Sequence, residues 1–347
     1  MTSKIIYVDK ESEIPLFGLD FLGIIDRGTN IIELKPITLC NLQCKYCFVS
    51  AGSYLTNFIV KPSYLIEKAN LLAEIKGRHD LEIHLAPYGE ILLYPELDDL
   101  IDQLWTISGV KKISMQTNGL LLSPEIIQKL EQVKLSRINI SLNTFDKKLA
   151  EDLANCQSYD IKSLLKNINL LLDTQIDVLL APVWFPGVND KDIQEIIQFV
   201  NKMRPQGYSE EEIQLGIQKY LTYKTGRRLR NIHPKTWGYF YQKLSMLEDK
   251  YNLKLKLGPH DFGIHSRKLY FLELQKGDAI SVKITSPGRW QNEAIGKIND
   301  QFAAKVLLNS PVTSSTQVME KEIKVKILRT SPRDNIITAF FPPEDIF

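Results

Sequence analysis

The chain has 347 residues, of which 44% are apolar and 24% are charged, and its formal net charge is +2. This is the composition of an ordinary globular protein, and so small a net charge excludes a strong overall attraction to nucleic acid or to a membrane. No stretch approaches the roughly 18 to 20 continuous apolar residues of a membrane-spanning helix. We therefore expect a cytoplasmic protein without a membrane partner, which would contact a polyanion only through a local patch.

Between residues 30 and 220, apolar β-branched runs alternate with amphipathic helical stretches. The predicted strands are Ile31–Pro36, Asp80–Leu85, Lys111–Gln116, Ser136–Leu142, Asp177–Val183 and Ile213–Lys219. The predicted helices are Ser63–Lys76, Pro95–Ile107, Pro124–Val133, Ile161–Asp173 and Asp190–Met203, the last with Asn189 as a cap. Six such units predict an α/β fold with a partial (β/α)6 barrel, whose reactive groups gather at the carboxyl ends of the strands.

The pattern changes after residue 232. One long helix is predicted over Pro234–Tyr251, and short β runs separated by turns follow from Leu269 onward. These runs are Ala279–Thr285, Ala294–Ile298, Ala303–Leu308, Glu322–Ile327 and Ile336–Phe340. Five short strands predict a small β-barrel of the OB type. The predicted domains are an N-terminal extension (1–30), an α/β core with the helix that follows it (31–257) and a C-terminal β domain (258–347).

Three of the four cysteines, Cys40, Cys44 and Cys47, lie within eight positions after the first core strand. A [4Fe–4S] cluster normally takes four thiolates, so a loop that offers three leaves one iron open to bind a substrate. A structural zinc ion would need a fourth cysteine or histidine nearby, and the nearest histidines are over 30 residues away. Zinc and three unrelated thiols remain the alternatives.

The CxxxCxxC spacing, with Tyr46 directly before the last cysteine, resembles the signature of the radical S-adenosylmethionine (SAM) superfamily. The resemblance extends from about Ile31 to Tyr220. It implies that Cys40, Cys44 and Cys47 hold a [4Fe–4S] cluster whose open iron binds SAM. It also implies that an electron from the cluster cleaves SAM to a 5′-deoxyadenosyl radical, which abstracts hydrogen from a substrate. An electron-donor protein would then be a partner.

Residues at the strand ends extend this resemblance. Gly89 and Glu90 follow the second strand and resemble the end of the glycine–glycine–glutamate motif that holds the SAM ammonium. Asn118 follows the third strand, and Ser141 and Asn143 share one face at the end of the fourth, where relatives contact SAM. The simpler interpretations are a solvated glutamate in a turn, a common Asn–Gly turn and ordinary capping residues.

Further polar features suggest a substrate. Trp184, at the rim of the sheet, could stack on a base or pack in the core, and Cys156 could be a catalytic thiol or an inert small residue. The segment Lys219–Lys235 carries six lysines and arginines and no acidic residue. We predict that its Arg227, Arg228 and Arg230 contact RNA phosphates, the alternative being a solvated basic loop.

The C-terminal runs resemble the TRAM domain of several tRNA-modifying enzymes in strand number and turns. Together with the core motifs, this implies an archaeal-type radical SAM transferase that modifies a nucleoside in RNA, with tRNA as partner and carbon methylation as the favoured reaction. The alternatives are a radical SAM enzyme that acts on a peptide or small molecule, and a non-enzymatic RNA-binding iron–sulfur sensor. We expect a monomer.

Overall fold

The computed structural model describes residues 3–308 and 315–342, and the chain divides into two compact units. Unit 1 comprises residues 1–39, 53–111 and 265–347, and unit 2 comprises residues 40–52 and 112–264. In the part of the chain that the structure describes, no helix is both long and apolar enough to cross a membrane.

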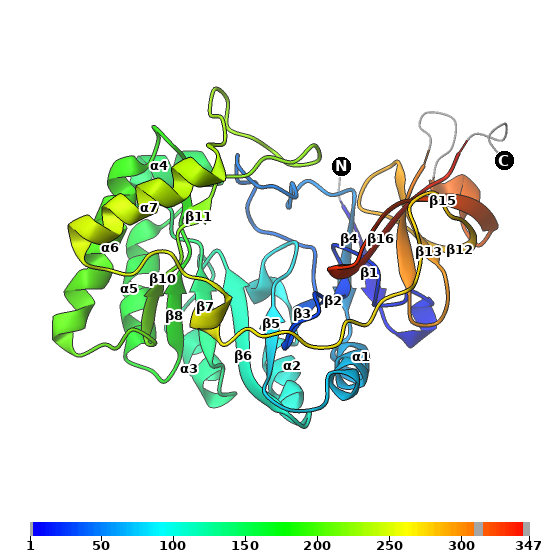
Figure 1. Cartoon of the computed structure of the whole chain (residues 1–347), viewed down its shortest axis with the longest axis horizontal. Coiled ribbons are helices and arrows are strands. Elements are labelled where there is room, and N and C mark those ends of the chain that lie inside the picture. The colour runs from blue at the N-terminus through cyan, green and yellow to red at the C-terminus, as the bar shows by residue number, and fades with distance from the viewer. Residues whose placement is uncertain (1–2, 309–314, 343–347) are drawn as a thin grey trace. The chain divides into compact units, whose positions relative to one another are not determined.

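Unit 2 is built on parallel strands with helices packed against them (Figure 1). β7 (Arg137–Ile140) pairs with β6 (Val110–Thr117) and with β8 (Asp177–Leu180), and β8 pairs with β10 (Ile213–Leu215). Helix packing buries the apolar faces of these strands. The helices are α3 (Pro124–Gln132), α4 (Lys147–Ala154), α5 (Ile161–Leu172), α6 (Asp190–Met203) and α7 (Trp237–Tyr251), with short 3₁₀ turns at Arg204–Gln206 and Pro259–Phe262.

Two predicted strands of unit 2 are each broken in the middle. β8 is separated from β9 (Val183–Trp184), and β10 is separated from β11 (Gln218–Lys219), which pairs with β9 in a sheet of its own. Pro182 lies at the first break, and a proline has no N–H for a ladder hydrogen bond. The predictions of continuous strands over 177–183 and 213–219 were therefore wrong.

Unit 1 contains a second set of strands and the C-terminal barrel. β3 (Ile31–Lys35) pairs in parallel with β5 (Leu81–Leu85) and antiparallel with β2 (Gly23–Asp26), while β1 (Lys4–Val8) pairs with β4 (Thr56–Val60). The helices here are α1 (Pro62–Ile75), α2 (Leu97–Leu104) and the short α8 (Ser315–Val318), with 3₁₀ turns at Lys10–Ser12 and Ile91–Leu93.

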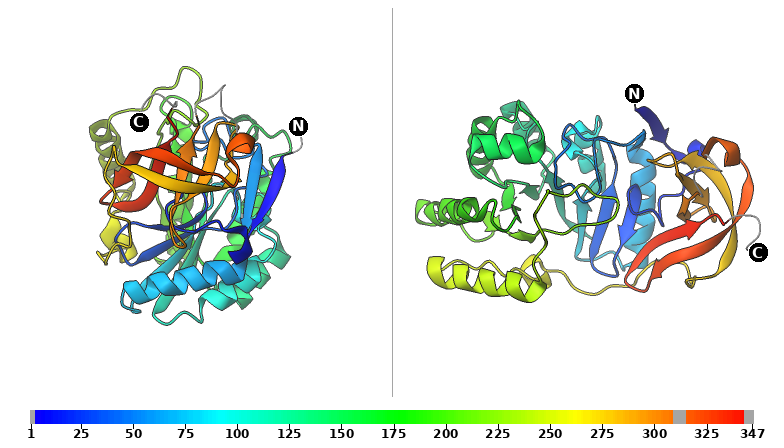
Figure 2. Two further views of the ribbon diagram at one scale, coloured as in Figure 1. Left: turned by 90° about the vertical axis from the view of Figure 1, so that its right-hand side faces the viewer. Right: turned by 90° about the horizontal axis from the view of Figure 1, so that it is seen from above.

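The last five strands form a closed barrel in the order β12-β13-β14-β16-β15 (Figure 2, orange to red). Their bounds are Ala279–Pro287, Glu293–Lys297, Ala303–Leu307, Glu322–Ser331 and Asp334–Phe340. The mixed α/β fold and the small C-terminal β domain are thus confirmed. The six-unit barrel as a whole and the domain boundaries after residues 30 and 257 stay predictions.

The barrel is joined to the N-terminal segment within unit 1. The amide of Ala303 donates to the carbonyl of Phe17 (2.8 Å), and the amide of Ile337 donates to the carbonyl of Gly18 (2.7 Å). Gly18 has a φ of 101°, and a Cβ at this position would lie 1.9 Å from the carbonyl oxygen of Ala303. Only glycine allows this approach.

Candidate active site

The cysteine loop, which we define as residues 40–52, belongs to unit 2. The amide of Cys47 donates to the carbonyl of Cys44 (3.2 Å), and the amide of Ala51 lies 3.3 Å from the Sγ of Cys47. Cys40, Cys44 and Cys47 are all partly exposed and none forms a disulfide. The loop therefore presents three thiols, none of which is in a disulfide.

This donor set fits an iron–sulfur cluster, which thiolates hold. Burial, aided by the neighbouring Cys47, raises the pKa of Cys44 to about 11, although Arg227 opposes the shift. The thiolate thus needs a cation beside it to be populated at neutral pH. Within the described residues, no group of three His, Cys, Asp or Glu side chains is arranged to hold a metal ion. Ligation by these three cysteines therefore stays a prediction.

Helix α4, which sequence reasoning missed, supports the cysteine loop. The backbone amide of Lys45 donates to the carbonyl of Leu153 (2.9 Å), and the side chain of Lys45 pairs with Asp152. Asp146 caps the helix by accepting from the amide of Leu149 (2.7 Å). The signal that could have revealed α4 is this aspartate, which precedes an eight-residue amphipathic stretch.

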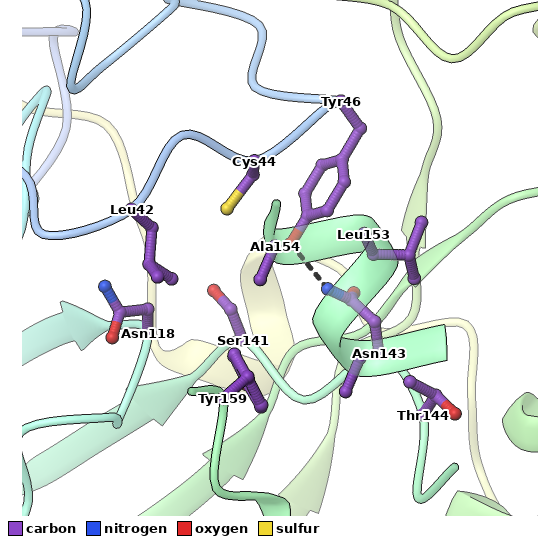
Figure 3. A pocket seen from close by; sticks show the side chains of 11 residues that line it. Leu42, Cys44, Tyr46, Asn118, Ser141, Asn143, Thr144, Leu153, Ala154 and Tyr159 are labelled. Atoms are coloured by element: carbon purple, nitrogen blue, oxygen red, sulfur yellow. Dashed lines mark hydrogen bonds between the residues drawn. The ribbon is translucent and has the colours of Figure 1, made fainter. Parts of the chain in front are cut away.

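A small pocket opens beside the cysteine loop (Figure 3). Its wall combines Cys44 and Tyr46 of the loop with the strand-end residues Asn118, Ser141 and Asn143. The sequence predicted that these three polar residues lie at neighbouring strand ends, and the structure brings them together with the loop. Polar groups that converge in a concave site suit an oriented small ligand.

Two hydrogen bonds fix the strand-end residues of this pocket. The side-chain amide of Asn118 donates to the Oδ1 of Asn41 (2.8 Å), which links the end of β6 to the cysteine loop. The hydroxyl of Ser141 accepts from the side-chain amide of Gln116 (3.0 Å). Because the oxygen of Ser141 is the acceptor in this bond, its O–H group can still donate to a ligand.

Asn143 connects three elements of unit 2. Its Nδ2 donates to the hydroxyl of Tyr46 (2.6 Å), and its Oδ1 accepts from the amide of Val183 (2.8 Å). Its carbonyl accepts from the side chain of Asn189 (3.0 Å), whose Oδ1 accepts from the amide of Phe185 (2.7 Å). Asn189 precedes α6 as predicted, but its side chain organises this turn and makes no cap hydrogen bond to the helix.

The Gly89–Glu90 turn lies in unit 1, where local packing requires both residues. A Cβ at Gly89 would lie 2.0 Å from the carbonyl oxygen of Leu39. Glu90 is only 2% exposed, and its carboxylate accepts from the amide of Leu92 (3.1 Å). The alternative of a solvated glutamate is therefore wrong, because this carboxylate is buried. Its predicted contact with the SAM ammonium stays a prediction.

Two other predicted residues lie apart from the pocket lining. Trp184 is 5% exposed, donates from Nε1 to Asp190 (2.8 Å) and stacks against Tyr239 at a centroid distance of 6.1 Å. Its ring therefore packs in the protein and offers little surface to a base. The Sγ of Cys156 lies 3.4 Å from the hydroxyl of Ser158, and Cys156 does not line the pocket.

The three arginines of the basic segment differ in their surroundings. Arg228 and Arg230 are exposed, as a phosphate contact requires. Arg227 is partly buried, and its guanidinium donates to the carbonyls of Cys44 and Ala51, both at 2.7 Å. The prediction that all three contact RNA therefore needs correction for Arg227, whose guanidinium is already bound to the cysteine loop.

Comparison with protein families matches residues 34–200 to the radical SAM superfamily. The chain belongs to the radical SAM superfamily. It is also 33% identical to an uncharacterized protein of Methanocaldococcus jannaschii, over 97% of this chain and 80% of the relative. This radical SAM enzyme therefore uses a [4Fe–4S] cluster and SAM.

More distant relatives share the core of the enzyme. GTP 3′,8-cyclase of Aquifex aeolicus is 25% identical over 52% of this chain and 56% of its own length, so the match spans about half of each protein. The [FeFe]-hydrogenase maturase HydG of Carboxydothermus hydrogenoformans has the same fold, with a TM-score of 0.53 at 12% identity over 67% of this chain and 55% of that one.

Proposed function

We propose that this radical SAM enzyme modifies a nucleoside within RNA, with tRNA as the first substrate to test. The observation that carries the proposal is an aromatic and basic face of unit 2, which we define as the exposed basic and aromatic side chains of segment 219–235 and of the start of α7, together with the half-buried Lys219. Trp237 is 52% exposed and Tyr239 is 48% exposed. The ammonium groups of Lys219 and Lys235 lie 5.0 Å and 5.6 Å from the ring centroids of Trp237 and Tyr239, respectively.

This face combines the two groups that bind single-stranded nucleic acid. Aromatic rings stack on bases, and lysines and arginines neutralise phosphates. These exposed rings are not part of the buried face of α7. That face consists of Phe240, Leu244 and Leu247. Tyr239 also stacks on Trp184 and Trp237 on Tyr241, yet about half of each of the Trp237 and Tyr239 side chains stays exposed and could meet a ligand.

The pocket beside the cysteine loop would hold the cofactors. Bound together, the cluster and SAM supply hydrogen abstraction from an unactivated carbon of the substrate. Cys40, Cys44 and Cys47 would hold the cluster, while the hydroxyl of Ser141 is placed to donate to a ligand. Carbon methylation remains the predicted reaction, and the role of Cys156 in it remains a prediction.

The C-terminal barrel supports the RNA proposal more weakly. Five strands that close into a barrel agree with the predicted OB-type or TRAM-like domain. The span Lys276–Arg333 has ten lysines and arginines against five acidic residues. This surplus would favour contact with a polyanion.

A second candidate substrate is a free purine nucleotide. GTP 3′,8-cyclases, which their name describes as acting on GTP, are among the relatives that share the core. A nucleotide and an RNA nucleoside both carry a base and a phosphate, so the face described above suits either one. RNA is favoured because four exposed aromatics (Tyr223, Trp237, Tyr239 and Tyr241) exceed what one base would use.

The test measures tRNA binding by the wild-type enzyme and by an Arg228→Gln/Arg230→Gln variant across a range of salt concentrations. Loss of two phosphate contacts should weaken binding and flatten the slope of log affinity against log salt by about 1.4 to 1.8. A Lys191→Gln/Lys202→Gln variant of α6 removes the same charge outside the basic segment and should bind like wild type. Absence of salt-dependent tRNA binding by the wild type, together with GTP binding, would favour the nucleotide alternative.

The modified nucleoside can be sought directly. Mass spectrometry of tRNA nucleosides from a deletion strain and its parent should show one nucleoside that is present only in the parent. Identical nucleoside profiles would contradict a tRNA substrate.

A further inference from the structure

A short segment of the chain lies along the cysteine loop, and we call these residues, 223–227, the strap. At its start, the rings of Tyr223 and Phe48 are in contact, with centroids 5.8 Å apart. In its middle, the hydroxyl of Ser50 donates to the carbonyl of Thr225 (2.9 Å). The strap therefore touches the cysteine loop through both side chains and backbone, although about 175 residues separate the two in sequence.

The strap is close enough to the loop to require a glycine. A Cβ at Gly226 would lie 2.5 Å from the carbonyl oxygen of Phe48 and 2.7 Å from its carbonyl carbon. Real Cβ atoms do not approach backbone atoms so closely, so any larger residue would push the strap away from the loop.

Arg227 makes the most extensive contact between the strap and the loop. Its backbone amide donates to the carbonyl of Cys47 (2.8 Å), its Nε donates to the carbonyl of Cys44 (2.7 Å), and its Nη2 donates to the carbonyl of Ala51 (2.7 Å). Three carbonyls spread over eight residues of the loop are thus bound by one residue. Two of them belong to cysteines predicted to hold the cluster.

The chemistry of arginine suits this arrangement better than that of lysine. A guanidinium is planar and presents donors in a fixed fork, so it binds two carbonyls at once in a defined geometry. A lysine ammonium is a single point on a flexible chain. The guanidinium also places a permanent positive charge beside Cys44, where a reduced cluster would carry more negative charge than an oxidised one.

We propose that Arg227 is a positioning residue that holds the cysteine loop in its cluster-binding conformation and raises the reduction potential of the cluster. It does so from outside the CxxxCxxC motif and independently of which substrate the enzyme takes. The strap continues directly into the exposed Arg228 and Arg230, so the backbone that reaches the proposed substrate face also fixes the cofactor loop.

The experiment compares three variants of the full-length enzyme reconstituted with iron and sulfide: Arg227→Gln, Arg227→Lys and the charge control Lys202→Gln. The readouts are iron and sulfide content, the rate of iron loss to a chelator and the midpoint potential of the cluster. Arg227→Gln should lose iron about tenfold faster than wild type and should have a more negative potential. Arg227→Lys should recover the potential because it keeps the charge, but should still lose iron faster because it lacks the fork. Lys202→Gln should match wild type in every readout.

Gly226→Ala provides an independent test because it keeps the arginine but displaces the strap. It should accelerate iron loss as Arg227→Gln does. Circular dichroism and thermal unfolding of the cluster-free variants report whether the rest of the protein folds normally. If Arg227→Gln and Gly226→Ala fold and keep both the wild-type rate of iron loss and the wild-type potential, the proposal is overturned. Equal potentials for Arg227→Gln and Arg227→Lys would also contradict it.

Discussion

The side-chain amide of Asn143 donates a 2.6 Å hydrogen bond to the hydroxyl of Tyr46, and this bond joins the end of β7 to the cysteine loop (Figure 3). The ring of Tyr46 also packs on Phe185 at a centroid distance of 4.8 Å. The aromatic residue inside the cysteine motif therefore anchors the loop to the strand ends.

Asn143→Ala should destabilise the protein by about 1–3 kcal/mol, because the amide of Val183 loses its acceptor along with the Tyr46 contact. Tyr46→Phe loses one hydrogen bond and should cost about 0.5–1.5 kcal/mol. Urea unfolding of both single variants and the double variant measures the shared bond, since the double variant should cost less than the sum. Strict additivity would mean that the two side chains do not interact in solution.

Each of the single variants Cys40→Ala, Cys44→Ala and Cys47→Ala should fail to assemble a cluster with about four irons and four sulfides. SAM cleavage to 5′-deoxyadenosine in the presence of a strong reductant should be lost with it. Cys156→Ala is the matched control, because this cysteine lies outside the cysteine loop and the pocket lining. A cluster that survives the loss of one loop cysteine would show that another group ligates the iron.

The predicted contact of Glu90 with SAM can be tested with a variant that removes the negative charge of Glu90 but preserves its hydrogen bond within the fold. Glu90→Gln keeps an oxygen that can accept from the amide of Leu92, but it removes the negative charge proposed to pair with the SAM ammonium. A charge-assisted hydrogen bond contributes about 1.5–3 kcal/mol, so SAM affinity should fall by roughly 10- to 150-fold while stability changes little. Titration of SAM measures this. If wild type and Glu90→Gln bind SAM with equal affinity, Glu90 does not contact SAM and its carboxylate has a structural role, accepting the hydrogen bond from the amide of Leu92.

The stability of unit 1 should depend on pH through Glu33. Burial opposes ionisation of this carboxyl, but the nearby Lys35 (2.7 Å) and Arg27 (3.0 Å) outweigh it and lower the pKa of Glu33 from 4.5 to about 2. A lowered carboxyl pKa stabilises the fold above the unfolded-state value, so this contribution is present above about pH 4.5 and is lost as the pH falls toward 2.

Glu33→Gln tests that dependence in cluster-free protein. At pH 7 it should cost about 3–5 kcal/mol, because it leaves the buried Lys35 without its partner. The difference from wild type in urea unfolding should shrink as the pH falls below 4.5. Lys35 also donates to the carbonyl of Ala86 (2.6 Å), just before the Gly89–Glu90 turn, so loss of the pair should loosen that turn. A difference that does not change with pH would contradict this account.

Local patterns predicted most of the elements that carry the site. The alternation of β-branched and helical runs located β3, β5, β6 and β7, and the turn residues located all five barrel strands. The cysteine spacing predicted the family, because that motif is contiguous in sequence. The convergence of Asn118, Ser141 and Asn143 also followed from strand ends meeting at one edge of a sheet.

Long-range contacts could not be predicted from local patterns. Arg227 belongs to a run of basic residues, and nothing in that run distinguishes it from Arg228. Among the contacts seen in the described residues, however, only Arg227 binds the cysteine loop through its guanidinium. Trp184 at the rim could have faced solvent, but α7, which starts more than 50 residues later, covers it. Both outcomes depend on packing between distant segments.

The hydrogen bonds from the barrel to Phe17 and Gly18 have a consequence for biosynthesis. Unit 1 is assembled from the first and the last parts of the chain, with most of unit 2 encoded between them. On the ribosome, the carbonyls of Phe17 and Gly18 must therefore wait for their barrel partners, Ala303 and Ile337, which come 286 and 319 residues later in the chain. Contacts so distant in sequence are slow to form, so unit 2 has time to fold first while the N-terminal strands are exposed to chaperones.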